Sequence, residues 1–130
     1  MRLDTDTISV VRKTKGKLPS LPFVDMANTI LGKKFELSLV FVGQNESQEI
    51  NNSSRQKNYP TNVLSFPLSE SSGEIFICLS KVRSDARLFE KTYSEFLLHI
   101  VVHGMLHLKG YNHGPVMDKL EEKYIKRFSF

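Results

Sequence analysis

The sequence predicts an α+β fold in which a mixed sheet of about four strands packs against helices. Segments that alternate apolar and polar residues are interspersed with segments of helical spacing, without the strict strand-helix alternation of βαβ units. The length of 130 residues fits one compact domain, so residues 1–130 are assigned to a single domain. With 40% hydrophobic and 25% charged residues, the composition is that of a globular protein.

The first part of the chain carries patterns typical of both strands and helices. Residues 8–14 (ISVVRKT) and 35–42 (FELSLVFV) have the alternation of strands. Between them, Phe23–Leu31 has helical spacing, with Gly32 as its C-cap. Residues 44–62 are strongly polar, and they predict a short helix followed by an irregular loop over 51–60 (NNSSRQKNYP). A loop of this length in so small a domain indicates a functional role.

The second part predicts two short strands and three helices. The strands are 63–66, closed by Pro67, and 75–79. Ser80 is the expected N-cap of a helix that runs to about position 90. A central helix follows from about Thr92 or Ser94 to Lys109, and Gly110 stops it. Pro115 suits the start of a last helix, which carries one apolar face made of Val116, Leu120, Tyr124 and Ile125.

Several classes of protein are excluded by composition. The single cysteine, Cys78, cannot form an internal disulfide, so a disulfide-stapled secreted scaffold is excluded. The first ten residues carry no apolar signal core, and the longest uncharged apolar run, Phe96 to Leu108, is too short to cross a bilayer. We therefore expect a reduced, cytoplasmic protein without a membrane partner. On charge alone, the net +4 is most simply a solvated basic surface.

All four histidines lie between positions 99 and 113. His99, His103 and His107 follow at intervals of four within EFLLHIVVHGMLHLKG, so they line one stripe of a largely buried helix. A lone histidine on an apolar face is usually a hydrogen-bonded core residue. A cluster of buried imidazoles cannot satisfy all its own nitrogens, whereas a divalent metal can do so.

His103 and His107 are one helical turn apart, and Gly110 lets the chain turn so that His113 returns as a third ligand. Three nitrogen ligands leave one position open, which is the arrangement of catalytic zinc. His99 lies one turn further back and is expected to support the site rather than bind the metal.

The histidine segment matches the metzincin pattern HExxHxxGxxH at every ligand and at the glycine, but Gly104 stands where that pattern has a glutamate. Without this general base, peptide hydrolysis by the metalloprotease mechanism lacks its proton acceptor. A metallopeptidase is therefore the least favoured of the enzymatic alternatives.

Three stretches of the sequence match the motifs of one known family. Residues 103–113, HGMLHLKGYNH, resemble the signature HGxLHLxGYDH. Residues 50–67, INNSSRQKNYPTNVLSFP, resemble LNxxYRxKDxPTDVLSFP, and Gly73-Glu74-Ile75 resembles GDI. With these motifs the chain resembles the YbeY family of endoribonucleases, also called rRNA maturation factors. The resemblance implies a zincin-like topology, and it implies zinc on the three histidines His103, His107 and His113.

The resemblance also implies single-strand-directed RNA cleavage in rRNA processing, including maturation of the small-subunit rRNA 3′ end, and in ribosome quality control. The expected partners are ribosomal RNA and the ribosome or its small subunit, and no DNA partner is expected. The functional arginine of the family falls on Arg55. A guanidinium facing the metal can grip a phosphate bidentately and stabilise the charge that develops during phosphoryl transfer.

Basic and aromatic side chains within the two longer motifs are expected to contact RNA. Lys57 and Lys109 are expected to help hold the backbone, and Tyr59, Phe66 and Tyr111 to offer faces for unpaired bases, although core packing is the simpler role for Phe66. The departures from the family pattern are Ser54, Asn58, Asn62, Glu74 and Asn112.

Asn112 matters most among these departures because it adjoins His113, and an amide cannot accept a proton as a carboxylate can. We expect metal binding to survive this change and the rate or pH optimum to be altered. It also leaves open a non-catalytic ribosome-associated factor that keeps its metal for stability.

Overall fold

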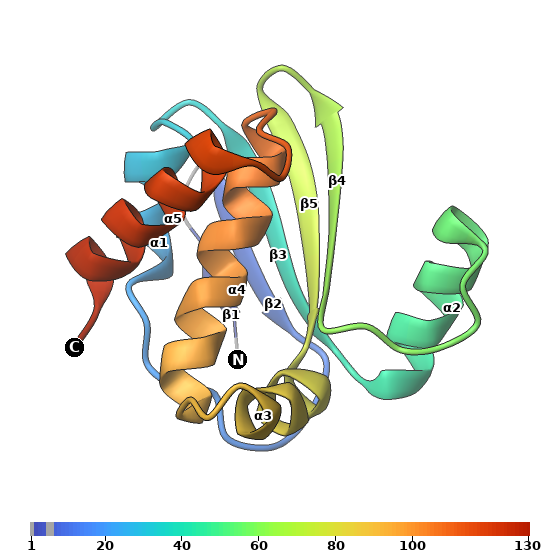
Figure 1. Cartoon of the computed structure of the whole chain (residues 1–130). Coiled ribbons are helices and arrows are strands. Elements are labelled where there is room, and N and C mark those ends of the chain that lie inside the picture. The colour runs from blue at the N-terminus through green and yellow to red at the C-terminus, as the bar shows by residue number, and fades with distance from the viewer. Residues whose placement is uncertain (1, 5–6) are drawn as a thin grey trace.

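The computed structural model describes residues 2–4 and 7–130, and a five-stranded mixed sheet is the base on which its helices pack (Figure 1). The strand order is β1-β2-β3-β5-β4. The strands are β1 (Arg2–Asp4), β2 (Ile8–Arg12), β3 (Glu36–Val42), β4 (Val63–Ser69) and β5 (Ser72–Cys78). The three central strands are parallel, and the two edge strands are antiparallel to their neighbours. The α+β class and the mixed sheet are confirmed, and β1 is a short edge strand that the sequence analysis did not predict.

Five helices complete the described part of the chain: α1 (Phe23–Ile30), α2 (Gln44–Arg55), α3 (Leu79–Leu88), α4 (Tyr93–Leu108) and α5 (Pro115–Phe128). The predicted central helix is α4. Its start is set by a capping box, in which Thr92 Oγ1 accepts from the Glu95 N–H and the Glu95 carboxylate accepts from the Thr92 N–H. None of the helices among the described residues is long and apolar enough to cross a membrane, and the expected cytoplasmic location stays a prediction.

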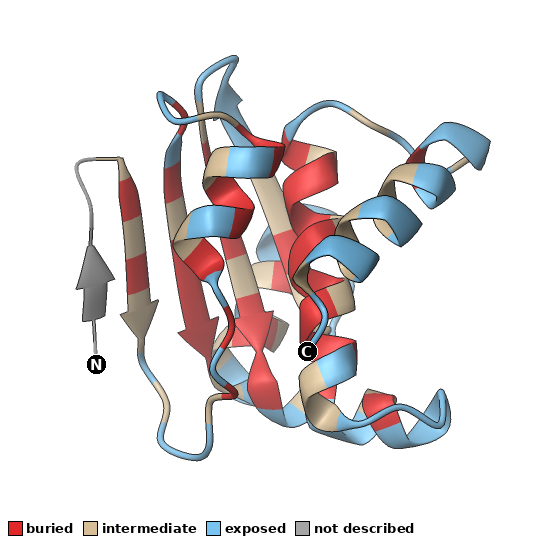
Figure 2. Cartoon of the chain, turned by 90° about the vertical axis from the view of Figure 1, so that its left-hand side faces the viewer, coloured by how far each residue is buried: buried red, intermediate tan, exposed pale blue. Residues whose placement is uncertain are grey.

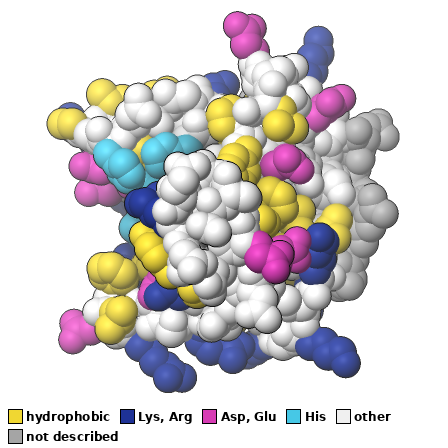
Figure 3. All heavy atoms as spheres, turned by 90° about the vertical axis from the view of Figure 1, so that its right-hand side faces the viewer, with side chains coloured by type: hydrophobic (Ala, Val, Ile, Leu, Met, Phe, Trp, Pro, Cys, Tyr) yellow, Lys and Arg dark blue, Asp and Glu magenta, His cyan; other side chains and the backbone are white. Residues whose placement is uncertain are grey.

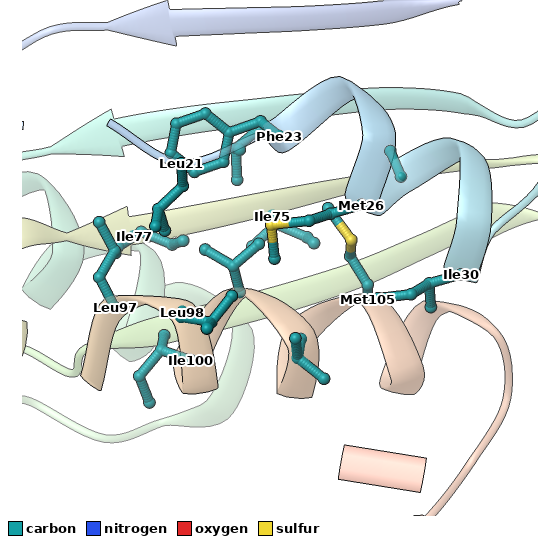
Figure 4. Packing of buried hydrophobic residues seen from close by; sticks show 14 of the residues in the cluster. Leu21, Phe23, Met26, Ile30, Ile75, Ile77, Leu97, Leu98, Ile100 and Met105 are labelled. Atoms are coloured by element: carbon teal, nitrogen blue, oxygen red, sulfur yellow. The ribbon is translucent and has the colours of Figure 1, made fainter. Parts of the chain in front are cut away.

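The core lies between the sheet and α4, because α4 is apolar on most of its circumference. Met26 of α1, Ile75 of β5 and Met105 of α4 meet there, each with no exposed surface (Figure 4). Buried residues are concentrated where strands face helices, while the outer sides of the helices are exposed (Figure 2). This packing holds the histidine-bearing helix rigidly against β4 and β5.

The predicted loop over 51–60 is wrong in its first half, because α2 continues to Arg55. Periodicity missed these residues because α2 has no apolar stripe. Its buried side chains are polar instead: Ser47 Oγ donates to the Thr61 carbonyl at 2.8 Å and accepts from the Thr61 N–H at 3.0 Å, and Asn51 donates to the Tyr59 carbonyl at 2.9 Å. Hydrogen bonds to the following loop therefore hold α2 in place, whereas the other helices are held by apolar burial.

Three further details differ from the sequence analysis. Helix α3 begins at Leu79, so Ser80 is not its N-cap: the helix follows β5 directly, and Leu79 is buried. Strand β4 continues through Pro67, since an edge strand tolerates a residue without an N–H. On α5 the buried residue is Met117, while Val116 is 64% exposed.

Candidate metal centre

A cleft of about 550 Å³ lies where the C-terminal half of α4, strand β4 and the end of α2 meet. Figure 3 shows histidine side chains gathered on this side of the molecule, with a basic side chain next to them. The lining residues include the arginine and all three histidines that the sequence analysis selected: Arg55, His103, His107 and His113. Residues more than 45 positions apart in the sequence therefore border one cavity.

His103 and His107 lie on successive turns of α4, and His113 follows the turn after the helix. Gly110 makes this turn with a φ of 102°, which disfavours any residue with a Cβ, and its N–H donates to the His107 carbonyl at 3.0 Å. One ligand atom from each histidine lies within 4.8 Å of the others. The turn predicted from Gly110 is thus the feature that returns His113 to the helix.

Hydrogen bonds on the far side of two rings determine which nitrogen carries the proton. His103 Nδ1 lies 2.8 Å from Glu121 Oε2, and His107 Nδ1 lies 3.0 Å from the Tyr111 carbonyl oxygen. Both partners are acceptors, so each Nδ1 is the donor and each Nε2 is left with a lone pair. The two Nε2 atoms are only 3.0 Å apart.

Two lone pairs at this distance cannot hydrogen-bond to each other, but a cation between them satisfies both. Burial lowers the pKa of His107, and the neighbouring His103 lowers it further, which favours the neutral imidazole that binds metal. The ring centroid of His113 lies 5.1 Å from those of His103 and His107. The donor set therefore fits a divalent metal held by three nitrogen ligands.

Arg55 is the last residue of α2, and it is exposed. Within the described residues no carboxylate forms a salt bridge with it, so its guanidinium is available to an anion in the cleft. Ser47 and Asn51 hold α2 against the loop that leads into β4. These buried polar contacts set the position of Arg55 opposite the histidines.

Comparison with known proteins agrees with this geometry. A family model described as "Endoribonuclease YbeY" matches residues 13–129. The chain belongs to the YbeY family. A Thermotoga sp. protein named Endoribonuclease YbeY is 42% identical over 98 residues, which cover 69% of this chain and 65% of the relative. A protein of the same name from Polynucleobacter asymbioticus is 38% identical over 103 residues, which cover 72% of this chain and 66% of the relative.

The chain thus spans just under two thirds of the length of these YbeY relatives. The similarity is also seen in the fold. The solution structure of a Thermotoga maritima protein matches this chain with a TM-score of 0.65 and 30% identity, and the match covers 92% of this chain and 87% of that one.

Position 104 of this YbeY chain is tightly packed. Ser65 Oγ donates to the Gly104 carbonyl at 3.2 Å. A Cβ atom at this position would lie 3.1 Å from Ser65 Oγ and 3.4 Å from Ile75. The helix approaches the sheet closely here, so a larger side chain at position 104 would have to displace Ser65.

The other residues selected from the sequence do not all line the cleft. Phe66 lines the cleft, with its ring edge-on to Phe76 at 5.9 Å. Tyr59, 52% exposed, lines a separate cavity of about 400 Å³ that shares Thr61 and Asn62 with the cleft. The residues that do not line the cleft are Lys57, Lys109, Tyr111 and Asn112, of which Tyr111 packs against the core.

Glu121 is the site residue that sequence reasoning missed. It lies on α5, 18 positions from His103, and its carboxylate contacts both His103 and His99. A signal was present: Glu121 follows Met117 by four residues, so it is an acid on the buried side of an amphipathic helix. His99 contacts this carboxylate and is not part of the three-histidine cluster, which agrees with a supporting role.

Proposed function

We propose that residues 1–130 work as one metal-dependent endoribonuclease domain that cleaves single-stranded RNA. The observation that carries the proposal is the single cleft shared by Arg55, His103, His107 and His113. We further propose that its substrate is ribosomal RNA, that it acts in rRNA processing including small-subunit 3′-end maturation and in ribosome quality control, and that it works in the cytoplasm. The names of the relatives and the net charge of +4 support an RNA partner.

The three histidines would hold a divalent cation, zinc in the first instance. Such a cation polarises a phosphodiester and lowers the pKa of a water molecule next to it. The chain itself contributes binding and charge. Arg55 donates from its planar fork to two phosphate oxygens and stabilises the additional negative charge of the transition state. Phe66 forms an apolar wall of the cleft against which an unpaired base can stack.

Cleavage of a labelled single-stranded RNA, with a hairpin of the same sequence content as comparison, tests this proposal. His107→Ala and Arg55→Ala are both expected to lose activity, and chelation is expected to abolish it reversibly. Arg87→Ala is the matched control, because Arg87 is exposed on α3 and does not line the cleft. Full activity of either cleft variant would refute the proposal.

A non-catalytic ribosome-binding factor is the second candidate, favoured by Asn112, an exposed amide beside His113. In that case the metal-loaded protein binds ribosomes without cutting RNA, and chelation unfolds it. The close packing of Gly104 against Ser65 does not favour a metallopeptidase. Ribosome co-sedimentation in parallel with the cleavage assay separates the first two candidates.

A further inference from the structure

We propose that Glu121 is a positioning residue that orients His103 toward the metal and is itself oriented by His99. This proposal rests on the proposed metal site. In it, neither Glu121 nor His99 binds the metal. Glu121, from a different helix, supports the ligand His103, and His99 supports Glu121.

One oxygen of Glu121 serves both histidines. Glu121 Oε2 lies 2.8 Å from His103 Nδ1 and 3.3 Å from His99 Nε2, and the side chain is 13% exposed. A carboxylate accepts hydrogen bonds only, so it holds the proton of His103 on Nδ1. The Nε2 lone pair of His103 is thereby directed into the cleft.

His99 has a defined part in this arrangement. Its Nδ1 atom is buried and has no hydrogen-bond partner among the residues that the structure describes. An N–H donor left in that position would cost more than a lone pair, so the proton belongs on Nε2, which faces Glu121. His99 therefore donates to the carboxylate and limits the directions in which it can turn.

Helix packing makes the contact possible. Helix α5 packs against α4 at an angle, after the turn that carries His113 (Figure 1). The buried Met117 anchors α5 one turn before Glu121. The turn after α4 thus brings two groups to the site. They are the ligand His113 and the carboxylate of Glu121, which supports the ligand His103.

Metal affinity is the direct test. Glu121→Ala, Glu121→Gln and wild type are titrated with Co²⁺ and Zn²⁺ in competition with a chromogenic chelator. We expect Glu121→Ala to weaken binding about 10- to 100-fold, the range typical of lost supporting hydrogen bonds to ligands. Glu121→Gln keeps an acceptor oxygen and is expected to restore part of the loss. Glu122→Gln is the matched control, because the exposed Glu122 has the same charge on the same helix.

Two further measurements separate positioning from a purely structural role. The visible absorption spectrum of the Co²⁺ form should change in Glu121→Ala and stay unchanged in Glu122→Gln, because it reports the geometry of the ligands. His99→Phe should weaken binding in wild type and add little in the Glu121→Ala background, since the two residues act through one contact.

The outcomes distinguish this proposal from the one it rests on. If His107→Ala loses metal while Glu121→Ala binds it within twofold of wild type with the same spectrum, the role of Glu121 is wrong and the metal site stands. If His107→Ala binds metal as wild type does, the metal site itself is wrong. Additive effects of His99→Phe and Glu121→Ala would overturn the part assigned to His99.

Discussion

The Nε2 atoms of His103 and His107 face each other at 3.0 Å, while the Nδ1 atom of each ring faces an oxygen acceptor. With both rings in these tautomers, a cation between the two Nε2 atoms satisfies both lone pairs, so metal binding is expected to stabilise the folded protein.

Zinc is expected to raise the thermal unfolding midpoint and chelation to lower it. A ligand at a thousand times its Kd stabilises the native state by about 4 kcal/mol. Differential scanning fluorimetry with and without chelator measures the shift. His107→Ala should lose the response to zinc, and an unchanged midpoint of the wild type on zinc addition would contradict the prediction.

Arg55 is expected to act through the geometry of its guanidinium as well as its charge. Arg55→Ala should lower kcat/KM for single-stranded RNA by roughly 10²- to 10³-fold, the range found for a removed donor to a transition-state oxyanion. Arg55→Lys should recover only part, because lysine cannot bind bidentately. Metal content should stay at the wild-type level in both variants. Equal activity of Arg55→Lys and wild type would show that charge alone suffices.

Gly104→Glu is expected to destabilise the fold without creating peptidase activity. The first carbon of the new side chain would already lie 3.1 Å from Ser65 Oγ. Overpacking of this kind costs about 1 to 3 kcal/mol, which urea denaturation measures. Ser65→Ala removes this oxygen together with its hydrogen bond to the Gly104 carbonyl, so it should cost less stability in a Gly104→Ala background than in the wild type. An equal cost in both backgrounds would show that Ser65 does not limit the space.

Asn51→Ala is expected to loosen the helix that carries Arg55. Asn51 is fully buried and donates to the Tyr59 carbonyl, so its removal should cost roughly 1 to 3 kcal/mol of unfolding free energy. RNA cleavage should fall as well, while metal affinity stays unchanged. Asn52→Ala is the control on the exposed side of the same helix, with an expected effect within about 0.5 kcal/mol. Equal stability of the two variants would rule out this anchoring role.

The capping box of α4 predicts a pH dependence of stability. Hydrogen bonds from Thr92 lower the pKa of Glu95 below 4.5. A carboxyl group with a depressed folded-state pKa contributes stability above its unfolded pKa, and this contribution is lost as the pH falls through the folded value. The stability difference between wild type and Glu95→Gln should therefore be largest near neutral pH and shrink below about pH 4.5. Denaturant titrations from pH 3 to pH 7 measure it, and a difference that grows on acidification would contradict the assignment.

Local patterns predicted most of the elements because each is encoded by neighbouring residues. The capping residues Thr92 and Glu95, the apolar run of α4 and Gly110 all lie within one stretch, so the histidine helix and its turn were predictable. Helix α2 was predictable only in part, since the contacts of Ser47 and Asn51 that stabilise it are made with a loop whose position no local pattern specifies.

The sequence by itself determined the three-histidine cluster, because intervals of four on a helix and one glycine turn set distances over a short span. Only the tertiary structure decided what surrounds that cluster. Arg55 reaches the cleft through α2, and Glu121 reaches His103 through the packing of α5 on α4. Contacts between separate helices depend on how apolar surfaces pack in the core, and that packing is a property of the whole chain rather than of any segment.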